Sequence, residues 1–458
     1  MAKQHTWLWM GIVALILGVL ILGLAWSHWP LRSSFLAQKK GASERPPPIS
    51  AASSPLAGTA SCSARGCHGA IEPVMNPAQC QQDEYNLWAH DRHADAYRVL
   101  FDKRSQEISR LLGPKKAHED PRCLACHTNP RLAVLPQETS FVQQERLFGV
   151  GCESCHGSAN SWLVAHTAKD WRLQKHKYKM PDLTDPTLQA RTCAGCHIGA
   201  APDEEAPLRD VNHDLIAAGH PRLNFEFGAF RANMPPHWRP RKMAEGQSWA
   251  VGQIVSAQAA LKLLSHRAKS GPWPEFAEYD CFACHHSLAS PSWRQSAIPV
   301  GRKLGNLRWG SWYFALTDSL AGESAELKSL RTILQRPNPD RQQAAAAAQA
   351  ALLKLKGFHA QLAGAKKDLD DLPLNRKRLC ALVKESRDEA GWDGSEQVYL
   401  ALHALNQSAA NPAVAAVLQE LTTLRAFPLC FDSPISWPQN GKGRFEPRDF
   451  FERLRRLR

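Results

Sequence analysis

Five pairs of cysteines, each followed directly by a histidine, constrain this 458-residue chain more than any other feature. Four pairs have two residues between the cysteines, and one pair has four. The motifs are Cys62–Cys67–His68, Cys123–Cys126–His127, Cys152–Cys155–His156, Cys193–Cys196–His197 and Cys281–Cys284–His285. With 19 histidines in the chain, five such matches have a chance probability on the order of one in ten million. The repeated pattern therefore needs a chemical explanation.

Cys-x-x-Cys-His is typical of c-type haem attachment. Two thiols must add to two vinyl groups of one porphyrin, and the next residue must place an imidazole over the iron. A disulfide framework would leave each histidine incidental, a zinc ribbon has no fixed histidine after each pair, and a redox dithiol needs one pair only. We therefore predict five covalently bound haem c groups. The predicted proximal iron ligands are His68, His127, His156, His197 and His285.

Histidine is also the expected second axial ligand. The chain has six methionines, of which Met1 and Met10 lie outside the motif region, whereas fourteen histidines lie outside the motifs. Mostly bis-histidine haems are therefore expected. The distal candidates are His93, His166, His213, His220 and His286. His90 is a rival of His93 because both lie on one face of a predicted helix, and for each candidate a merely hydrogen-bonded or solvent-facing role stays open.

One apolar segment is long enough to span a bilayer. Residues 7–26 contain no charged residue, and twenty residues in a helix extend about 30 Å, the thickness of a hydrocarbon core. A cleaved signal peptide would have a shorter apolar region and a cleavage site of small residues, which is not evident here. We predict a single N-terminal transmembrane helix within residues 1–32. Residues 33–60, rich in Ser, Ala and Pro, are expected to form a flexible linker.

Charge does not decide the orientation of this anchor. More basic residues follow the span than precede it, which by the positive-inside rule favours a cytoplasmic body. Haem c, however, is attached on the outer side of the membrane. We therefore predict an inner-membrane, single-pass protein with its haem domain in the periplasm. The formal charge of +13 favours acidic partners or an anionic lipid surface, and nucleic acid is not an expected partner of an exported cytochrome.

Residues 61 to about 200 resemble the tetrahaem cytochrome c554 family, within the larger group of c554/c-prime-like multihaem cytochromes. The similarity lies in the order of the motifs, in a Trp-x-x-x-x-His-Ala element at Trp88 and His93, and in the string GVGCESCHG at 149–157. The resemblance implies that His93 and His166 are distal ligands and that the iron of His127 is open. The chain departs from the family in its first motif, its fifth motif, its anchor and its long C-terminal region.

A mainly α fold is expected. We predict a pentahaem cytochrome domain with little regular sheet at 61–300, followed by an all-α domain at 301–458. Helical patterns occur at 249–267, 305–335, 341–356, 376–390, 395–407 and 412–425. In an oxidising compartment Cys380 and Cys430 are predicted to form a disulfide, and Cys80 is predicted to be a buried free thiol.

The leading functional hypothesis is electron transfer. Closely spaced bis-histidine haems would form a conduit in a respiratory pathway, with a quinol-oxidising complex or other cytochromes as redox partners. The alternative is a multihaem oxidoreductase that acts on a small nitrogen or sulfur compound at a five-coordinate haem, so an enzymatic role stays open. A third possibility is an assembly subunit that docks through its helical tail. The chain has no Cys-x-x-Cys-Lys motif, which counts against an ammonia-forming nitrite reductase.

Overall fold

The computed structural model describes residues 56–72, 82–235, 245–281, 284–285, 307–322, 324–364, 392–408, 410–425 and 447–454. Several predicted features lie outside these ranges, namely the span at 7–26, Cys80, His286, Cys380 and Cys430. Within the described ranges, no helix combines the length and apolarity needed to cross a bilayer. The membrane anchor and the disulfide therefore stay predictions.

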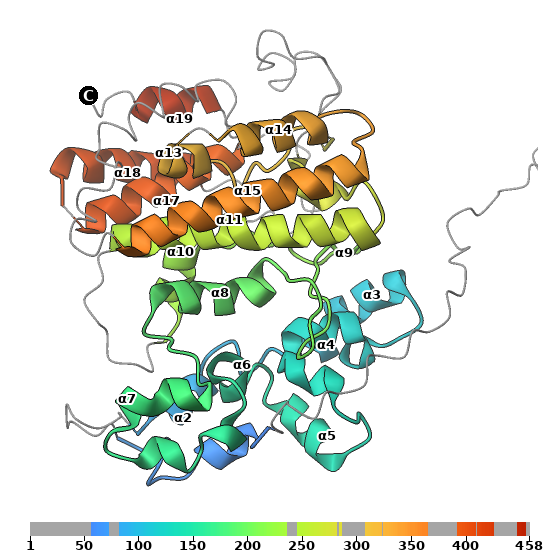
Figure 1. Ribbon diagram of the computed structural model, residues 1–458, viewed down its shortest axis with the longest axis vertical. Helices are drawn as coiled ribbons and strands as arrows, with labels where there is room; N and C mark the ends of the chain where they lie inside the picture. The colour runs from blue at the N-terminus through green and yellow to red at the C-terminus, as the bar shows by residue number, and fades with distance from the viewer. Residues whose placement is uncertain are drawn as a thin grey trace, which may run out of the picture. The chain divides into compact units, whose positions relative to one another are not determined.

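The regular structure of the described residues is helical (Figure 1). Across these residues the only β pairings are two isolated bridges, Ala200 with Arg209 and Tyr279 with Trp309. The prediction of a mainly α fold is confirmed.

Short helices fill the chain up to residue 235. The α-helices are α2 (Glu84–Ala89), α3 (Lys103–Leu112), α4 (Pro121–His127), α5 (Ser140–Leu147), α6 (Cys152–His156), α7 (Trp171–Gln174), α8 (Pro186–His197), α9 (His213–Ala217) and α10 (Phe227–Asn233). The 3₁₀ turns are η1 (Thr59–Cys62), η2 (Arg98–Phe101), η3 (Ala117–Glu119), η4 (Pro130–Val134), η5 (Ala159–Ser161), η6 (Ala165–Thr167) and η7 (Lys175–Tyr178).

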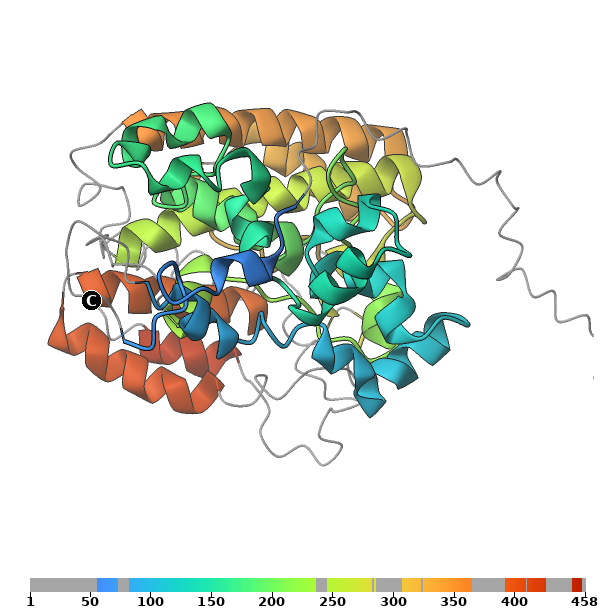
Figure 2. The same ribbon diagram turned by 90° about the horizontal axis from the view of Figure 1, so that it is seen from below.

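The helices after residue 244 are on the whole longer and pack against one another. They are α11 (Glu245–Ser270), α13 (Thr317–Ala321), α14 (Ala325–Leu334), α15 (Arg341–Gly364), α17 (Trp392–Ser408), α18 (Pro412–Arg425) and α19 (Pro447–Leu454), with the 3₁₀ turn η8 (Phe276–Glu278) between α11 and α13. Helices α11 and α15 run side by side, as Figure 1 shows and as Figure 2 shows from below in yellow-green and orange.

Helix α11 is the centre of this packing. It contacts α8, α10, α13, α15 and α17. Ile254 and Leu261 are completely buried, as helical spacing of apolar residues predicts for a central helix. Gly252 lets α10 approach closely, because a Cβ atom at Gly252 would come within 2.6 Å of the Phe227 Cβ atom.

Most of the predicted helices are present in the structure. The predictions at 249–267, 341–356, 395–407 and 412–425 correspond to α11, α15, α17 and α18, and 376–390 lies outside the described residues. The prediction of one helix at 305–335 is wrong. Helix α13 ends at Ala321, Gly322 adopts a positive φ of 79°, and the Ser324 side chain accepts the Leu327 amide proton at the start of α14. A left-handed glycine followed by an N-cap serine separates two helices.

Buried apolar side chains are unevenly distributed. The largest cluster extends from Ala190 in α8 to Leu454 in α19. The clusters before α8 are small and involve only a few residues, such as Leu100 with Leu124 and Leu132 with Val142. Helical packing continues across position 300, since α11 contacts α15 and α17. The domain boundary at 300 stays a prediction.

Candidate functional site

Three of the five motifs lie at the carboxyl ends of helices. Helices α4, α6 and α8 end at His127, His156 and His197. Residues three and four apart share one face of a helix, so the two cysteines and the histidine of each motif face the same way. Asp120 and Asp185 cap α4 and α8, each accepting a backbone N–H and each followed by a proline that favours helix initiation. Local sequence therefore positions the second and fourth motifs.

The first motif forms a turn instead of a helix. A Cβ atom at Gly66 would have no neighbour within 4 Å, so the longer loop between the cysteines bulges into open space, as expected. A Cβ atom at Gly69 would lie only 1.9 Å from the Ser63 carbonyl oxygen. Glycine is therefore required directly after His68.

Four predicted distal ligands each lie against the histidine of one motif. The ring-centroid distances are 6.1 Å for His68–His166, 5.9 Å for His93–His197, 6.4 Å for His127–His220 and 6.4 Å for His213–His285. The first and last pairs are nearly parallel, with interplanar angles of 17° and 22°, whereas the other two are nearly perpendicular, at 88° and 85°.

These distances fit one iron between each pair of rings. An imidazole nitrogen binds a transition metal at about 2 Å and lies about 1 Å from its ring centroid, so two axial imidazoles have centroids roughly 6 Å apart. Short helix α9 serves two such pairs, because His213 begins it and His220 follows its end. The pairing of His127 with His220 does not favour the open iron that the resemblance implied at His127.

Five histidines in these pairs engage Nδ1 in a hydrogen bond with the protein. The acceptors are the carboxylates of Glu84 for His68 (3.0 Å) and Asp91 for His93 (2.9 Å), and the carbonyl oxygens of Ala96 for His127 (2.7 Å), Pro221 for His220 (2.8 Å) and Leu163 for His166. An imidazole that donates its proton from Nδ1 keeps the Nε2 lone pair for a metal. The rings are therefore oriented as metal ligands require.

The pKa values of the buried histidines suit metal binding as well. Burial lowers the pKa of His127 and of His220, and it lowers the pKa of His197 to about 4, with the neighbouring His93 adding to the shift. These rings are neutral at pH 7, and a neutral imidazole is the form that binds a metal. The hydrogen bond with Asp91 instead raises the pKa of His93.

Cysteines of different motifs also approach one another. A hydrogen bond from the Cys152 thiol lowers the pKa of Cys62 to about 7, and a hydrogen bond from Cys126 lowers the pKa of Cys196 to about 7. The first motif therefore adjoins the third, and the second adjoins the fourth. Within each of these two pairs of motifs, the attachment points therefore lie close together.

The string GVGCESCHG packs on the segment that carries His93. Gly149 has a positive φ of 59°, and a Cβ atom there would lie 2.5 Å from the His93 carbonyl oxygen. The Val150 amide donates to that same oxygen at 2.9 Å, and the Trp88 indole donates to the Val150 carbonyl oxygen at 3.0 Å. Gly149 and Trp88, one from each of the two sequence elements, therefore both contribute to the packing of residues 149–150 on the segment of His93.

Glu153, inside the third motif, binds the segment that precedes the first motif. Its carboxylate accepts backbone N–H groups of Ala57 at 3.0 Å, Gly58 at 2.8 Å and Ala159 at 2.6 Å. The residue is only 2% exposed. Glu153 therefore joins the first motif region to the third.

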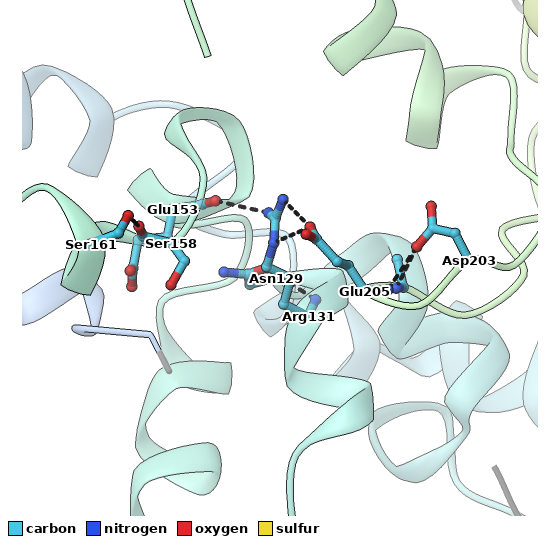
Figure 3. Close-up of polar contacts among 8 residues, drawn as sticks. Asn129, Arg131, Glu153, Ser158, Ser161, Asp203 and Glu205 are labelled. Carbon is cyan, nitrogen blue, oxygen red and sulfur yellow. Dashed lines mark hydrogen bonds and ion pairs between the residues drawn. The ribbon is translucent and has the colours of Figure 1, made fainter. Parts of the chain in front are cut away.

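Arg131 joins the second motif region to the third. Its guanidinium donates to the Glu153 carbonyl oxygen at 3.2 Å and to the Glu205 carboxylate at 2.9 and 2.7 Å (Figure 3). Figure 3 also shows Asn129, whose side chain caps the turn that begins η4 by accepting the Arg131 amide at 3.1 Å. These contacts hold the segments after His127 and around His156 in one arrangement.

Arg267 of α11 joins the two segments that supply the fifth site. It donates to Glu278 at 2.7 Å, three residues before Cys281, and it also contacts the carboxylate of Asp210, three residues before His213. The guanidinium is 9% exposed. The His213 amide donates to Glu275 at 2.8 Å. The longer helices thereby position the histidine pair of the fifth motif.

Three further histidines of the described residues are not paired with a motif histidine. His90 is exposed, His118 stacks on Phe101 with ring centroids 4.3 Å apart, and His359 in α15 lies 3.0 Å from the Thr187 hydroxyl. His286 lies outside the described residues. The structure thus brings His93, rather than its rival His90, to a motif histidine.

Part of the chain is similar to known proteins. Residues 77–157 match the family model described as cytochrome c554 and c-prime. A curated relative, cytochrome c-554 of Nitrosomonas europaea, is 27% identical over 133 residues. Over residues 77–157, the chain is therefore similar to the cytochrome c554 family. The aligned part is 26% of this chain and 54% of the relative, so the chain spans about half the length of the relative it matches. No solved structure matches the chain.

The sequence analysis missed several residues of this site. Glu84 and Asp91 bond to paired histidines, and Arg131 bonds to Glu153 of the third motif. Glu153 bonds to the Ala159 amide, and Arg267 bonds to Asp210 and Glu278, which lie near the fifth site. Two of them carried a local signal, because Asp91 lies two residues before His93 and Glu153 lies inside the third motif. Nothing local marked the other three.

Proposed function

We propose that this chain is a multihaem c-type cytochrome that transfers electrons, with haem c bound at each of the five motifs. The observation that carries the proposal is the set of four histidine pairs with centroid distances of 5.9 to 6.4 Å. Each pair joins one motif histidine to a histidine far away in the sequence. Chance packing does not explain a repeated distance that matches two ligands of one metal.

The residues of the chain would hold each haem and set its environment. Two thiols of each motif supply thioether bonds, and the paired imidazoles supply Nε2 atoms. A bound haem supplies one-electron chemistry between ferric and ferrous iron. The contacts of Cys62 with Cys152 and of Cys126 with Cys196 support short distances between neighbouring sites.

We further propose a periplasmic location with a single-pass anchor in the inner membrane. The uncharged segment 7–26 and the need to attach haem c outside the cytoplasm support this. Redox proteins of a respiratory pathway, such as a quinol-oxidising complex or other cytochromes, are the proposed partners. The positive formal charge of +13 favours an acidic docking surface on such a partner.

The test uses the full chain, expressed in a host that matures c-type cytochromes. Intact mass should exceed the polypeptide mass by five haems, and the ferric electron paramagnetic resonance spectrum should show low-spin signals from the four histidine pairs. A mass equal to the bare polypeptide would overturn the proposal. A high-spin signal that carries most of the iron and shifts with cyanide or nitric oxide would instead favour an oxidoreductase.

A further inference from the structure

Two of the histidine pairs differ from the pair His127–His220 in one respect. His68 bonds through Nδ1 to a carboxylate, Glu84, and His93 bonds likewise to Asp91. In the pair His127–His220, both Nδ1 atoms bond to backbone carbonyl oxygens, at 2.7 and 2.8 Å. These three sites therefore have different electrical surroundings although each has a histidine pair.

The two carboxylates are sheltered from water. The Asp91 side chain is 8% exposed and the Glu84 side chain is 18% exposed. A charge is screened less in such surroundings than at an open surface. Each carboxylate therefore acts on its imidazole over a short distance with little screening.

A charged acceptor changes the ligand as well as orienting it. An imidazole that donates its Nδ1 proton to a carboxylate becomes more electron-rich, and a more basic ligand stabilises ferric over ferrous iron. A carbonyl oxygen orients the ring with less effect on its basicity. The site of His127 and His220 also has a cation nearby, because Arg104 donates to the Gly219 carbonyl oxygen at 2.7 Å. A positive charge favours the ferrous state.

We propose that Glu84 and Asp91 are positioning residues that lower the reduction potentials of the sites of His68–His166 and His93–His197 below that of His127–His220. The inference rests on the proposed binding of haem at these pairs and adds an order of potentials to it. Among these three sites, electrons at equilibrium would occupy the site of His127 and His220 first.

The competing explanation is that the carboxylates only orient the rings. Glu84→Gln and Asp91→Asn separate the two explanations, because an amide keeps an oxygen acceptor but removes the charge. Asp95→Asn is the matched control for Asp91→Asn. Asp95 lies four residues further along the chain, and its side chain is 50% exposed and paired with Arg98.

The measurement is a potentiometric titration of the full haem-loaded chain, followed by electron paramagnetic resonance. Nearly parallel and nearly perpendicular axial imidazoles give different low-spin signals. The pair His68–His166, at 17°, can thereby be distinguished from His93–His197, at 88°. We expect Glu84→Gln to shift a signal of the parallel type and Asp91→Asn a signal of the perpendicular type.

Each amide substitution should raise the midpoint potential of its site by about 59 mV, which corresponds to about a tenfold change in the reduction equilibrium of a one-electron couple. Asp95→Asn should leave all midpoints in place, and Asp91→Glu, which keeps the charge, should stay closer to the unmodified protein than Asp91→Asn. Unchanged midpoints in both amide variants, with full haem content, would overturn the inference while leaving haem binding intact.

If one amide variant loses its haem, the titration of the other amide variant decides between the two explanations. Loss of haem from both amide variants would assign the carboxylates to haem loading and overturn the tuning role. If the unmodified chain carries no haem, the proposed function itself fails, which the intact mass shows before any titration.

Discussion

Arg222 and Asp393 are 171 positions apart in the sequence, and two nitrogens of the Arg222 guanidinium contact the two Asp393 carboxylate oxygens at 2.9 and 2.8 Å. Arg222 follows His220 by two residues, and Asp393 lies in the first turn of α17. The Tyr313 hydroxyl donates to the Leu223 carbonyl oxygen at 2.7 Å. The C-terminal helices thus hold the segment that presents His220.

Asp393→Ala should destabilise the protein strongly. The Asp393 side chain is 2% exposed, and its removal would leave the guanidinium of Arg222 buried without its partner, at a cost of about 3–5 kcal/mol. Chemical unfolding measures the change. Glu420→Ala is the control, because its pair with Arg453 is about 40% exposed and such pairs contribute about 0–1 kcal/mol. Equal losses in the two variants would contradict the assignment.

His166→Ala should open one axial position. The His166 ring lies 6.1 Å from that of His68, so its loss removes the second imidazole while both thiols of the first motif remain. We expect unchanged haem content by mass, loss of one low-spin signal of the parallel type, and a new high-spin signal that responds to cyanide. His176→Ala, at an exposed position, should change neither signal. A spectrum of His166→Ala identical to that of the unmodified protein would rule out His166 as a ligand.

Arg267→Met should affect the fifth site most. The substitution leaves the buried carboxylate of Glu278 and that of Asp210 without their common cation. We expect the parallel-type signal of His213–His285 to weaken while the perpendicular signals persist. Arg331→Met is the control, because its pair with Asp318 is about one-third exposed. Uniform loss of all signals in Arg267→Met would indicate general unfolding and not a role at this site.

Two glycine-to-alanine substitutions should have opposite signs. At Gly149, a positive φ and the 2.5 Å approach to the His93 carbonyl oxygen make alanine unfavourable, by about 1–3 kcal/mol or more. At Gly357, inside α15, a Cβ atom has no neighbour within 4 Å, so alanine should stabilise the helix by about 0.5–1 kcal/mol. Thermal unfolding measures both. A Gly149→Ala variant as stable as the unmodified protein would contradict the close packing of the two sequence elements.

Much of the helical structure could be predicted because its signals are local. Apolar spacing predicted α11 and helix propensity predicted α15, and the bounds predicted for α18 agree with the structure. The break between α13 and α14 was missed, because Gly322 and Ser324 lie inside a longer helical pattern. A single left-handed glycine outweighs the propensities on both sides of it.

By itself, the sequence determined the five cysteine–histidine motifs and the small set of histidines that could complete them. The motifs depend on residues one to six positions apart, whose geometry is set by one or two turns of the chain. Only the tertiary structure decided that His220 lies against His127 and His93 against His197, and that Glu84 and Asp91 bond to two of the rings. These partners meet through the packing of separate helices and turns, and no local pattern encodes which distant segments are brought together.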